Sequence, residues 1–168
     1  MKRIFLLTTM VFCSLQGNSA VGVIKHRNRA RPGVRSPPLE NVLTLQRVRN
    51  LAQAAQQLDD DTETRLIPAA QFAKKTNLFV CCLHANILDF YLWNLLTTED
   101  RYPDLDKVRT ELARVSRDLS QEGCSVVHVS DHDYSRKFRE GFHQMGKPAV
   151  NKAMGEIDIL FDSLSIFC

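Results

Sequence analysis

The sequence has little glycine and proline, with 7 and 6 among its 168 residues. An all-β sandwich or barrel needs frequent turns, and turns depend on these two residue types. The shortage therefore argues against that fold class. Charged residues make up 24% of the chain and hydrophobic residues 44%. This balance argues against disorder and indicates one globular domain with a sizeable core.

The chain also lacks an apolar run long enough to span a bilayer, which takes about 20 residues. Residues 78–96 come nearest, but polar side chains interrupt them: His84, Asn86, Asp89 and Asn94. We therefore expect no stable membrane insertion. We read His84 as a hydrogen-bonded core histidine and not as a metal ligand.

Signatures of catalysis are missing as well. The sequence contains no phosphate-binding loop, no dinucleotide fingerprint and no Gly-x-Ser-x-Gly elbow. His128 and His132 are four residues apart, but no glutamate occupies the position that a zinc protease requires. We predict that the protein is not an enzyme and uses no cofactor and no metal, and we see no nucleic-acid motif.

The first twenty residues have the pattern of a secretory signal peptide. Lys2 and Arg3 precede the short apolar run Ile4–Leu15, and small residues follow up to Ala20. Such a segment is removed on export. We expect cleavage after Ala20 and a secreted, extracellular protein.

Residues 21–36 read as a basic flexible arm, followed by a helical domain at 37–168. The arm carries five positive charges: Lys25, Arg27, Arg29, Arg31 and Arg35. Together with Lys2 and Arg3, these residues give positions 1–36 a charge of +7, and no acidic residue precedes position 37. Because the whole chain has a net charge of +3, residues 37–168 carry −4. An alternative function follows, in which the arm acts directly on anionic membranes in host defence.

Four cysteines remain after the signal peptide is removed: Cys81, Cys82, Cys124 and Cys168. An even number in an oxidising compartment predicts two disulfides. Neighbours on a helix point about 100° apart, so Cys81 and Cys82 must each reach a different partner. Their position in the chain leaves both assignments to Cys124 and Cys168 open.

Apolar residues recur at helical spacing in five stretches. The first opens at Ser36-Pro37-Pro38 and buries the face of Leu45, Val48, Ala52, Ala55 and Leu58. The others cover 77–96, 104–120 (stopped by Gly123), 134–145, and the segment after Pro148, where Cys168 shares a face with Leu164. A partial helix is expected at Leu66–Phe72. The fold class predicted is all-α, a compact six-helix bundle stapled by disulfides.

Three segments resemble the interleukin-10 family of class II helical cytokines. The most specific is Lys-Ala-Met-Gly-Glu-Ile-Asp-Ile-Leu-Phe at 152–161, which is similar to the family's last helix. Thr-Glu-Thr-Arg-Leu-Ile at 62–67 and Arg-Val-Ser-Arg-Asp-Leu-Ser at 114–120 are similar to a loop and a helix end. The resemblance covers roughly residues 32–168.

The resemblance also bears on the disulfides. Cys81-Cys82 is similar to the paired cysteines of one branch of the family, whereas a cysteine expected near Pro32 is absent. This implies that Cys82 takes its place as the partner of Cys124, which leaves Cys81 for Cys168.

The resemblance implies a secreted cytokine, monomeric or weakly dimeric. It would bind a two-chain cell-surface receptor, with a high-affinity chain and a shared second chain, and activate Janus kinase–STAT signalling in epithelial and mucosal defence. The matching positions nominate six receptor-binding residues: Thr62, Glu63, Arg65, Lys152, Gly155 and Glu156. The second chain would use the first helix and the helix at 104–120.

Overall fold

The computed structural model describes residues 35–69, 72, 75–97, 101–124 and 132–168. These contain seven helices and no strand, so the all-α fold class is confirmed. The signal peptide at 1–20, most of the arm at 21–36, Pro32 and His128 lie outside the described residues. None of the helices in the described ranges has both the length and the apolar character needed to cross a membrane.

The first predicted helix is divided in two at Asn41. Helix α1 (Pro37–Glu40) precedes α2 (Val42–Gln56). Asn41 has an extended backbone, and its side-chain Oδ1 accepts hydrogen bonds from the amides of Leu43 at 2.8 Å and Thr44 at 3.4 Å. Asparagine is a preferred helix N-cap, which explains why a new helix starts there. Because α2 ends at Gln56, Leu58 leaves the predicted apolar face and is 52% exposed.

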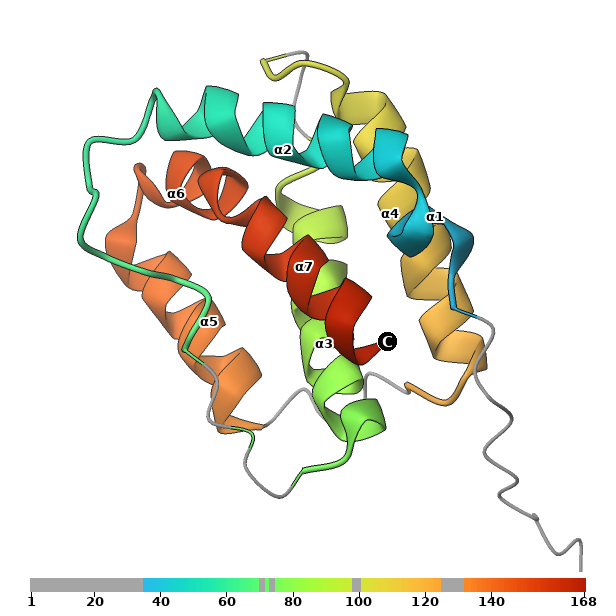
Figure 1. Ribbon diagram of the computed structural model, residues 1–168. Coiled ribbons are helices and arrows are strands. Elements are labelled where there is room, and N and C mark those ends of the chain that lie inside the picture. Colours follow the sequence, from blue (N-terminus) through green and yellow to red (C-terminus); the bar gives the residue numbers. More distant parts are fainter. Residues whose placement is uncertain (1–34, 70–71, 73–74, 98–100, 125–131) are drawn as a thin grey trace, which may run out of the picture. The chain divides into compact units, whose positions relative to one another are not determined.

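Helix α3 (Asn77–Asn94) is the central element of the bundle (Figure 1). It packs against α4 (Leu105–Gln121), α5 (Asp133–Met145) and α7 (Ile157–Phe167). Ten of its residues are buried, as expected for a helix that is apolar nearly all round. Thr76 caps its start by accepting a hydrogen bond from the Phe79 amide at 3.3 Å.

The last predicted helix is also divided. Helix α6 (Ala149–Gly155) and α7 are separated at Glu156, whose backbone is not helical. Helix α2 packs against both α6 and α7. The core that these contacts close includes the fully buried side chains of Leu51, Leu83, Leu88, Tyr91, Leu112, Phe138, Met154 and Phe161.

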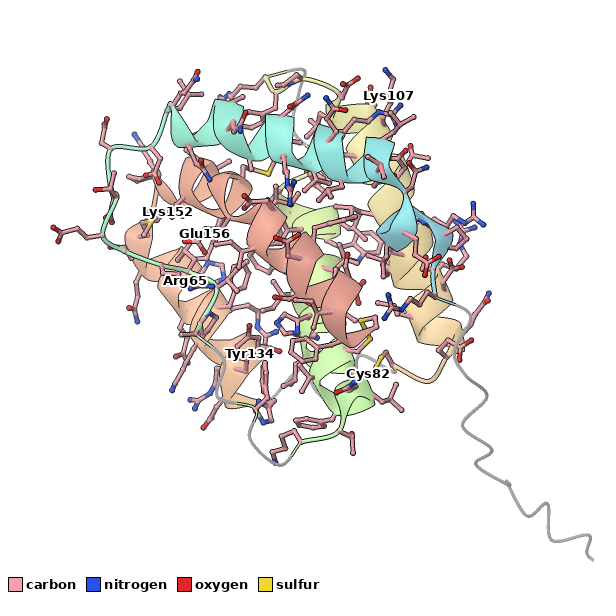
Figure 2. All side chains as sticks on the ribbon, in the orientation of Figure 1. Arg65, Cys82, Lys107, Tyr134, Lys152 and Glu156 are labelled. Carbon is pink, nitrogen blue, oxygen red and sulfur yellow. A yellow bond between two sulfur atoms is a disulfide. The ribbon has the colours of Figure 1, made fainter. Side chains whose placement is uncertain are left out.

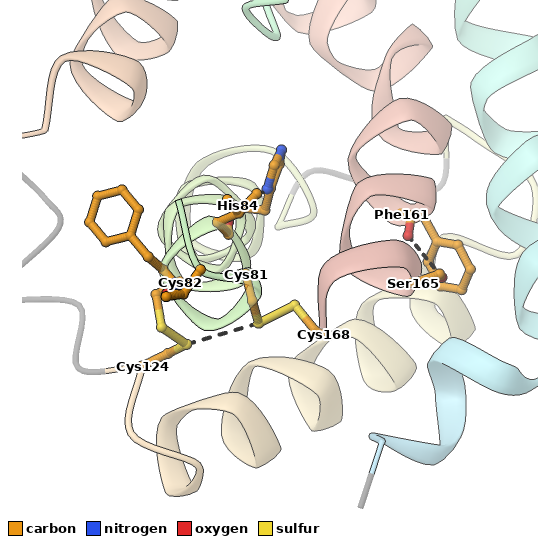
Figure 3. The surroundings of a disulfide bond; sticks show 10 residues. Cys81, Cys82, His84, Cys124, Phe161, Ser165 and Cys168 are labelled. Carbon is orange, nitrogen blue, oxygen red and sulfur yellow. Dashed lines mark hydrogen bonds between the residues drawn. A yellow bond between two sulfur atoms is a disulfide. The ribbon is translucent and has the colours of Figure 1, made fainter. Parts of the chain in front are cut away.

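Two disulfides tie the bundle together near the start of α3. Cys81 is bonded to Cys168, just beyond α7, and Cys82 is bonded to Cys124, just beyond α4 (Figure 3). The crosslinks span 87 and 42 residues of sequence. The pairing implied by the family resemblance is therefore the one that the structure contains.

Candidate receptor-binding site: a loop fixed by two buried charges

The segment between α2 and α3 runs beside α6 and then crosses in front of α5 in this view (Figure 2), and most of the predicted site lies along it. Thr62, Glu63 and Arg65 are exposed on this segment. Lys152 and Glu156 approach it from α6 and from the break after α6. Residues separated by about ninety positions in the chain thus form one surface, which we call the 59–67 loop surface.

Lys152 fixes the first half of the loop. Its side chain is 8% exposed, and its Nζ lies 3.0 Å from Oδ2 of Asp59, whose side chain is equally buried. The ammonium group also donates to the backbone carbonyl of Asp61. A buried ammonium is unfavourable unless it is paired and hydrogen-bonded. These two partners therefore explain how Lys152 is accommodated at 6% exposure of the whole residue.

Asp61 then folds the tip of the loop back on itself. Its Oδ1 accepts hydrogen bonds from the amides of Glu63 at 3.0 Å and Thr64 at 2.8 Å. Hydrogen bonds to the ionised carboxylate lower the pKa of Asp61, first that from the Thr64 side chain and then that from the Thr64 amide. Such local turns from an aspartate side chain are common where a chain reverses. The turn leaves Thr62 and Glu63 on the outside.

Glu156 fixes the second half of the loop. Its carboxylate accepts from the Leu66 amide at 2.9 and 3.1 Å and from the Ile67 amide at 2.7 Å. Burial raises the pKa of Glu156, and the backbone hydrogen bonds to the ionised form act against that rise. This one side chain thus satisfies two backbone donors of the loop.

The partial helix predicted at Leu66–Phe72 is therefore wrong for the described residues of that segment, 66–69 and 72, which are not helical. The Leu66 and Ile67 amides donate to the carboxylate of Glu156. Leu66 and Ile67 are buried against the core at 4% and 1% exposure. The loop is thus held by packing as well as by hydrogen bonds.

Gly155 has a packing role in this arrangement. It is buried, and a Cβ at its position would lie 3.0 Å from Cγ of Gln56 at the end of α2. The side-chain Nε2 of Gln56 donates to the Gly155 carbonyl at 2.6 Å. The missing side chain thus lets α2 and α6 approach each other closely.

Arg65 is the exposed cation of the site (Figure 2). Burial raises the pKa of both Glu156 and Tyr134, and the positive charge of Arg65 nearby acts against that rise. The structure thus places Thr62, Glu63 and Arg65 on one exposed loop, with Lys152, Gly155 and Glu156 buried beneath it. Three of the six are exposed and three are buried.

Asp59, Asp61 and Gln56 were missed as parts of the site by sequence reasoning. In the sequence alone, the run Asp59-Asp60-Asp61 resembles an ordinary polar loop after a helix. A signal was present in Lys152, which lies among apolar residues of the last helical stretch and therefore needs a buried anion. In the described ranges, no group of three His, Cys, Asp or Glu side chains is placed to hold a metal ion.

A groove lies at the other end of α2 from the 59–67 loop. The two ends of this helix are about 22 Å apart, since it has 15 residues with a rise of about 1.5 Å each. The groove lies between α1 and α4, and its lining includes Asn41, Thr44, Glu111, Arg114 and Arg117. Oγ1 of Thr44 and Oε2 of Glu111 are buried there without a hydrogen-bond partner. Val42 and Leu43 beside it are 75% and 58% exposed.

Comparison with known proteins agrees with this architecture. Residues 39–168 match the family model described as "Interleukin 22 IL-10-related T-cell-derived-inducible factor". Human interleukin-22 is 29% identical over 161 residues, covering 92% of this chain and 84% of that protein. Mouse interleukin-22b is 30% identical over 125 residues, covering 70% of this chain and 67% of that protein.

The crystal structure of zebrafish interleukin-22 has a similar fold. It matches with a TM-score of 0.69 and 28% sequence identity, covering 81% of this chain and 98% of that one. The family model spans the whole helical bundle from α1 to Cys168, including both disulfides and the 59–67 loop surface. The chain belongs to the interleukin-22 family of interleukin-10-related cytokines.

Proposed function

We propose that this cytokine is secreted and binds a two-chain class II cytokine receptor, and that binding activates Janus kinase–STAT signalling in epithelial cells. The observation that carries the proposal is the 59–67 loop, held in one shape by Lys152 and Glu156 while Thr62, Glu63 and Arg65 face outward. The family resemblance nominates these residues for the high-affinity receptor chain.

The geometry suits recognition by another protein. A loop that is ordered before binding loses less conformational entropy when it binds. The exposed charges of Glu63 and Arg65 can form directional pairs and accelerate encounter with a partner of complementary charge. In this proposal, Lys152, Gly155 and Glu156 contribute by positioning the loop, since their polar groups are bonded within the chain.

The shared second receptor chain would bind the other end of α2. The groove between α1 and α4 offers polar groups without partners, and Val42 and Leu43 offer apolar contact area beside it. Exposed apolar side chains next to unsatisfied polar ones are typical of interaction surfaces. Binding at two ends of one helix would bring two receptor chains together.

A charge reversal tests the first surface. Purified Arg65→Glu protein should bind the high-affinity receptor ectodomain at least about tenfold more weakly, the effect of losing 1.4 kcal/mol, with an unchanged circular dichroism spectrum. Arg109→Glu is the matched control, because Arg109 is exposed on α4, away from this loop, and its affinity should be unchanged. Equal binding by Arg65→Glu and the unsubstituted protein would contradict the proposal.

A separate variant tests the second surface. Leu43→Glu should keep its affinity for the high-affinity chain but fail to raise STAT phosphorylation in epithelial cells, because only recruitment of the second chain is lost. Loss of both activities together in a folded variant would show that the two surfaces are not distinct.

A further inference from the structure

The two disulfides lie in direct contact with each other. The Sγ atoms of Cys81 and Cys124, which belong to different disulfides, are 4.0 Å apart (dashed line in Figure 3). This separation is close to van der Waals contact, and a sulfur–sulfur bond is about 2.0 Å long. A shift of about 2 Å would therefore bring these two sulfurs to bonding distance.

The four cysteines differ in how accessible they are. Cys81, Cys82 and Cys124 are 2%, 8% and 2% exposed, whereas Cys168 lies beyond the end of α7 and is partly exposed. Thiol–disulfide exchange requires that an attacking thiolate reach a sulfur atom. Cys168 is therefore the sulfur that a small thiol from solution meets first.

We infer that Cys168 is a thiol-exchange site, and that exchange there leads to a second exchange at the Cys82–Cys124 disulfide. A small extracellular thiolate, such as that of glutathione, attacks Sγ of Cys168 and forms a mixed disulfide, and Cys81 leaves as a thiolate. The Cys81 thiolate attacks Sγ of Cys124, so that a Cys81–Cys124 disulfide forms and Cys82 leaves as a thiolate. The final thiolate takes a proton from water. The number of disulfide bonds stays at two throughout.

Cys81 cannot take the alternative route to Cys82. The two residues are neighbours on α3, and their side chains point about 100° apart around the helix. Their direct bond would require the helix to unwind locally. Attack on Cys124 needs no such change, because that sulfur already lies against Cys81.

The exchange changes which elements are tied together. The α3–α4 crosslink is preserved in a new form, whereas the bond that holds the end of α7 to α3 is lost. Phe167, next to Cys168, stacks on His84 with ring centroids 5.9 Å apart and meets Phe72 edge-on at 6.0 Å. After exchange, the last turn of α7 is held only by noncovalent contacts of this kind and by the hydrogen bond from Ser165 Oγ to the Leu39 carbonyl.

Peptide mapping tests the relay on the unmodified, folded protein. The protein is treated with reduced glutathione below one equivalent, quenched in acid, alkylated and digested. Because Cys81 and Cys82 are adjacent, both crosslinks join the same two peptides, and tandem mass spectrometry must locate the bond by fragmentation between these two residues. We expect glutathione on Cys168, an alkyl group on Cys82, and a Cys81–Cys124 crosslinked peptide in amounts comparable with Cys82–Cys124 among the modified molecules. If every modified molecule carries an alkylated Cys81 and an intact Cys82–Cys124 bond, with no Cys81–Cys124 bond found, the inference is overturned.

A pair of variants gives an independent readout without added thiol. Cys168→Ala leaves the Cys81 thiol beside Cys124, so both the Cys82–Cys124 and the Cys81–Cys124 bonds should be found in the purified protein. Cys81→Ala is the matched control and should contain only Cys82–Cys124. If Cys168→Ala is folded by circular dichroism and contains only Cys82–Cys124, the inference is wrong.

Discussion

At the scale of single residues, the site depends on two opposite charges that do not pair with each other. Lys152 and Glu156 are four positions apart, a spacing at which helix side chains often meet. Here the helix is interrupted between them, and each turns to a different half of the 59–67 loop. The two residues act as anchors that impose the shape of the loop.

We predict strong energetic coupling between Lys152 and Asp59. Removing either partner of a buried ion pair leaves an uncompensated charge and costs about 3 kcal/mol. Lys152→Ala and Asp59→Ala should therefore each lower the free energy of unfolding by about that amount, while the double variant loses clearly less than the sum. Urea denaturation of the four proteins measures this, and additive losses would show that the pair is not coupled.

His84 is the buried titratable group of the core between α3 and α5. Its Nδ1 lies 2.8 Å from the Val80 carbonyl and therefore carries the hydrogen, while its Nε2 accepts from the Tyr134 hydroxyl at 3.0 Å. Burial raises the pKa of Tyr134 to about 12, so that hydroxyl keeps its proton. Burial also lowers the pKa of His84 below its usual 6.5.

A pH dependence of stability follows from His84. As the pH falls below 6.5, the unfolded chain binds a proton at this histidine and the folded chain does not. The free energy of unfolding should therefore decrease from pH 6.5 down to the lowered pKa of the folded protein. Burial raises the pKa of Asp89, Glu156 and Asp158, and these groups act in the opposite direction.

His84→Phe separates the pH dependence due to the histidine from that due to the buried carboxylates, because it removes the histidine and keeps the carboxylates. The difference in stability between the unsubstituted protein and this variant should shrink as the pH is lowered from about 7.5 to about 5, measured by urea denaturation. A difference that stays constant over this range would show that His84 titrates equally in both states.

At the scale of helices, the close approach of α2 and α6 depends on Gly155. Alanine there would force Gln56 to move and weaken its 2.6 Å hydrogen bond, a loss of about 1 kcal/mol. Gly141 in α5 is the matched control, since a Cβ there makes an ordinary 3.4 Å contact with Leu66. We expect Gly141→Ala to raise stability by about 0.5–1 kcal/mol through helix propensity.

Thermal and urea denaturation of these two variants, alone and with Gln56→Ala, check the explanation. Gly155→Ala should lower stability in the original protein and become nearly neutral once Gln56 is truncated. The same stabilising effect at both glycines would contradict a special role for the α2–α6 contact.

The helices themselves could be predicted from the sequence because periodicity is a local signal. Leu105, Val108, Leu112, Val115 and Leu119 are all buried on α4, as their spacing indicates. The breaks at Asn41 and Glu156 were not predicted. Asn41 carries a recognisable capping side chain, whereas Glu156 leaves the helical backbone at a point where its carboxylate meets the Leu66 and Ile67 amides.

For the site, too, short motifs indicated the segments but not the contacts between residues far apart in the chain. The motifs at 62–67 and 152–161 lie in segments that the structure brings together, and Arg65 is exposed. Burial of Lys152, Gly155 and Glu156 could not be read from the motif, because it depends on Asp59, Gln56 and backbone amides about ninety residues away. Only the folded chain brings these groups together.

At the scale of the whole molecule, the crosslinks and the proposed receptor-binding loop occupy different regions. Both disulfides lie at Cys81 and Cys82, near the start of α3, whereas the 59–67 loop contacts α6. Each crosslink closes a long stretch of chain, and chain-entropy arguments give about 4–5 kcal/mol for loops of this length. The bundle is thus held by covalent bonds in one region and presents a loop fixed by hydrogen bonds in another.

Amide hydrogen exchange, in the free protein and with the high-affinity receptor ectodomain, tests the central claim most directly. If the loop is already formed by Lys152 and Glu156, the Leu66 and Ile67 amides should exchange slowly in the free protein. Receptor binding should then add protection across residues 59–67. Fast exchange at Leu66 and Ile67 in the free protein, or protection by the receptor that leaves this loop unchanged, would contradict the account.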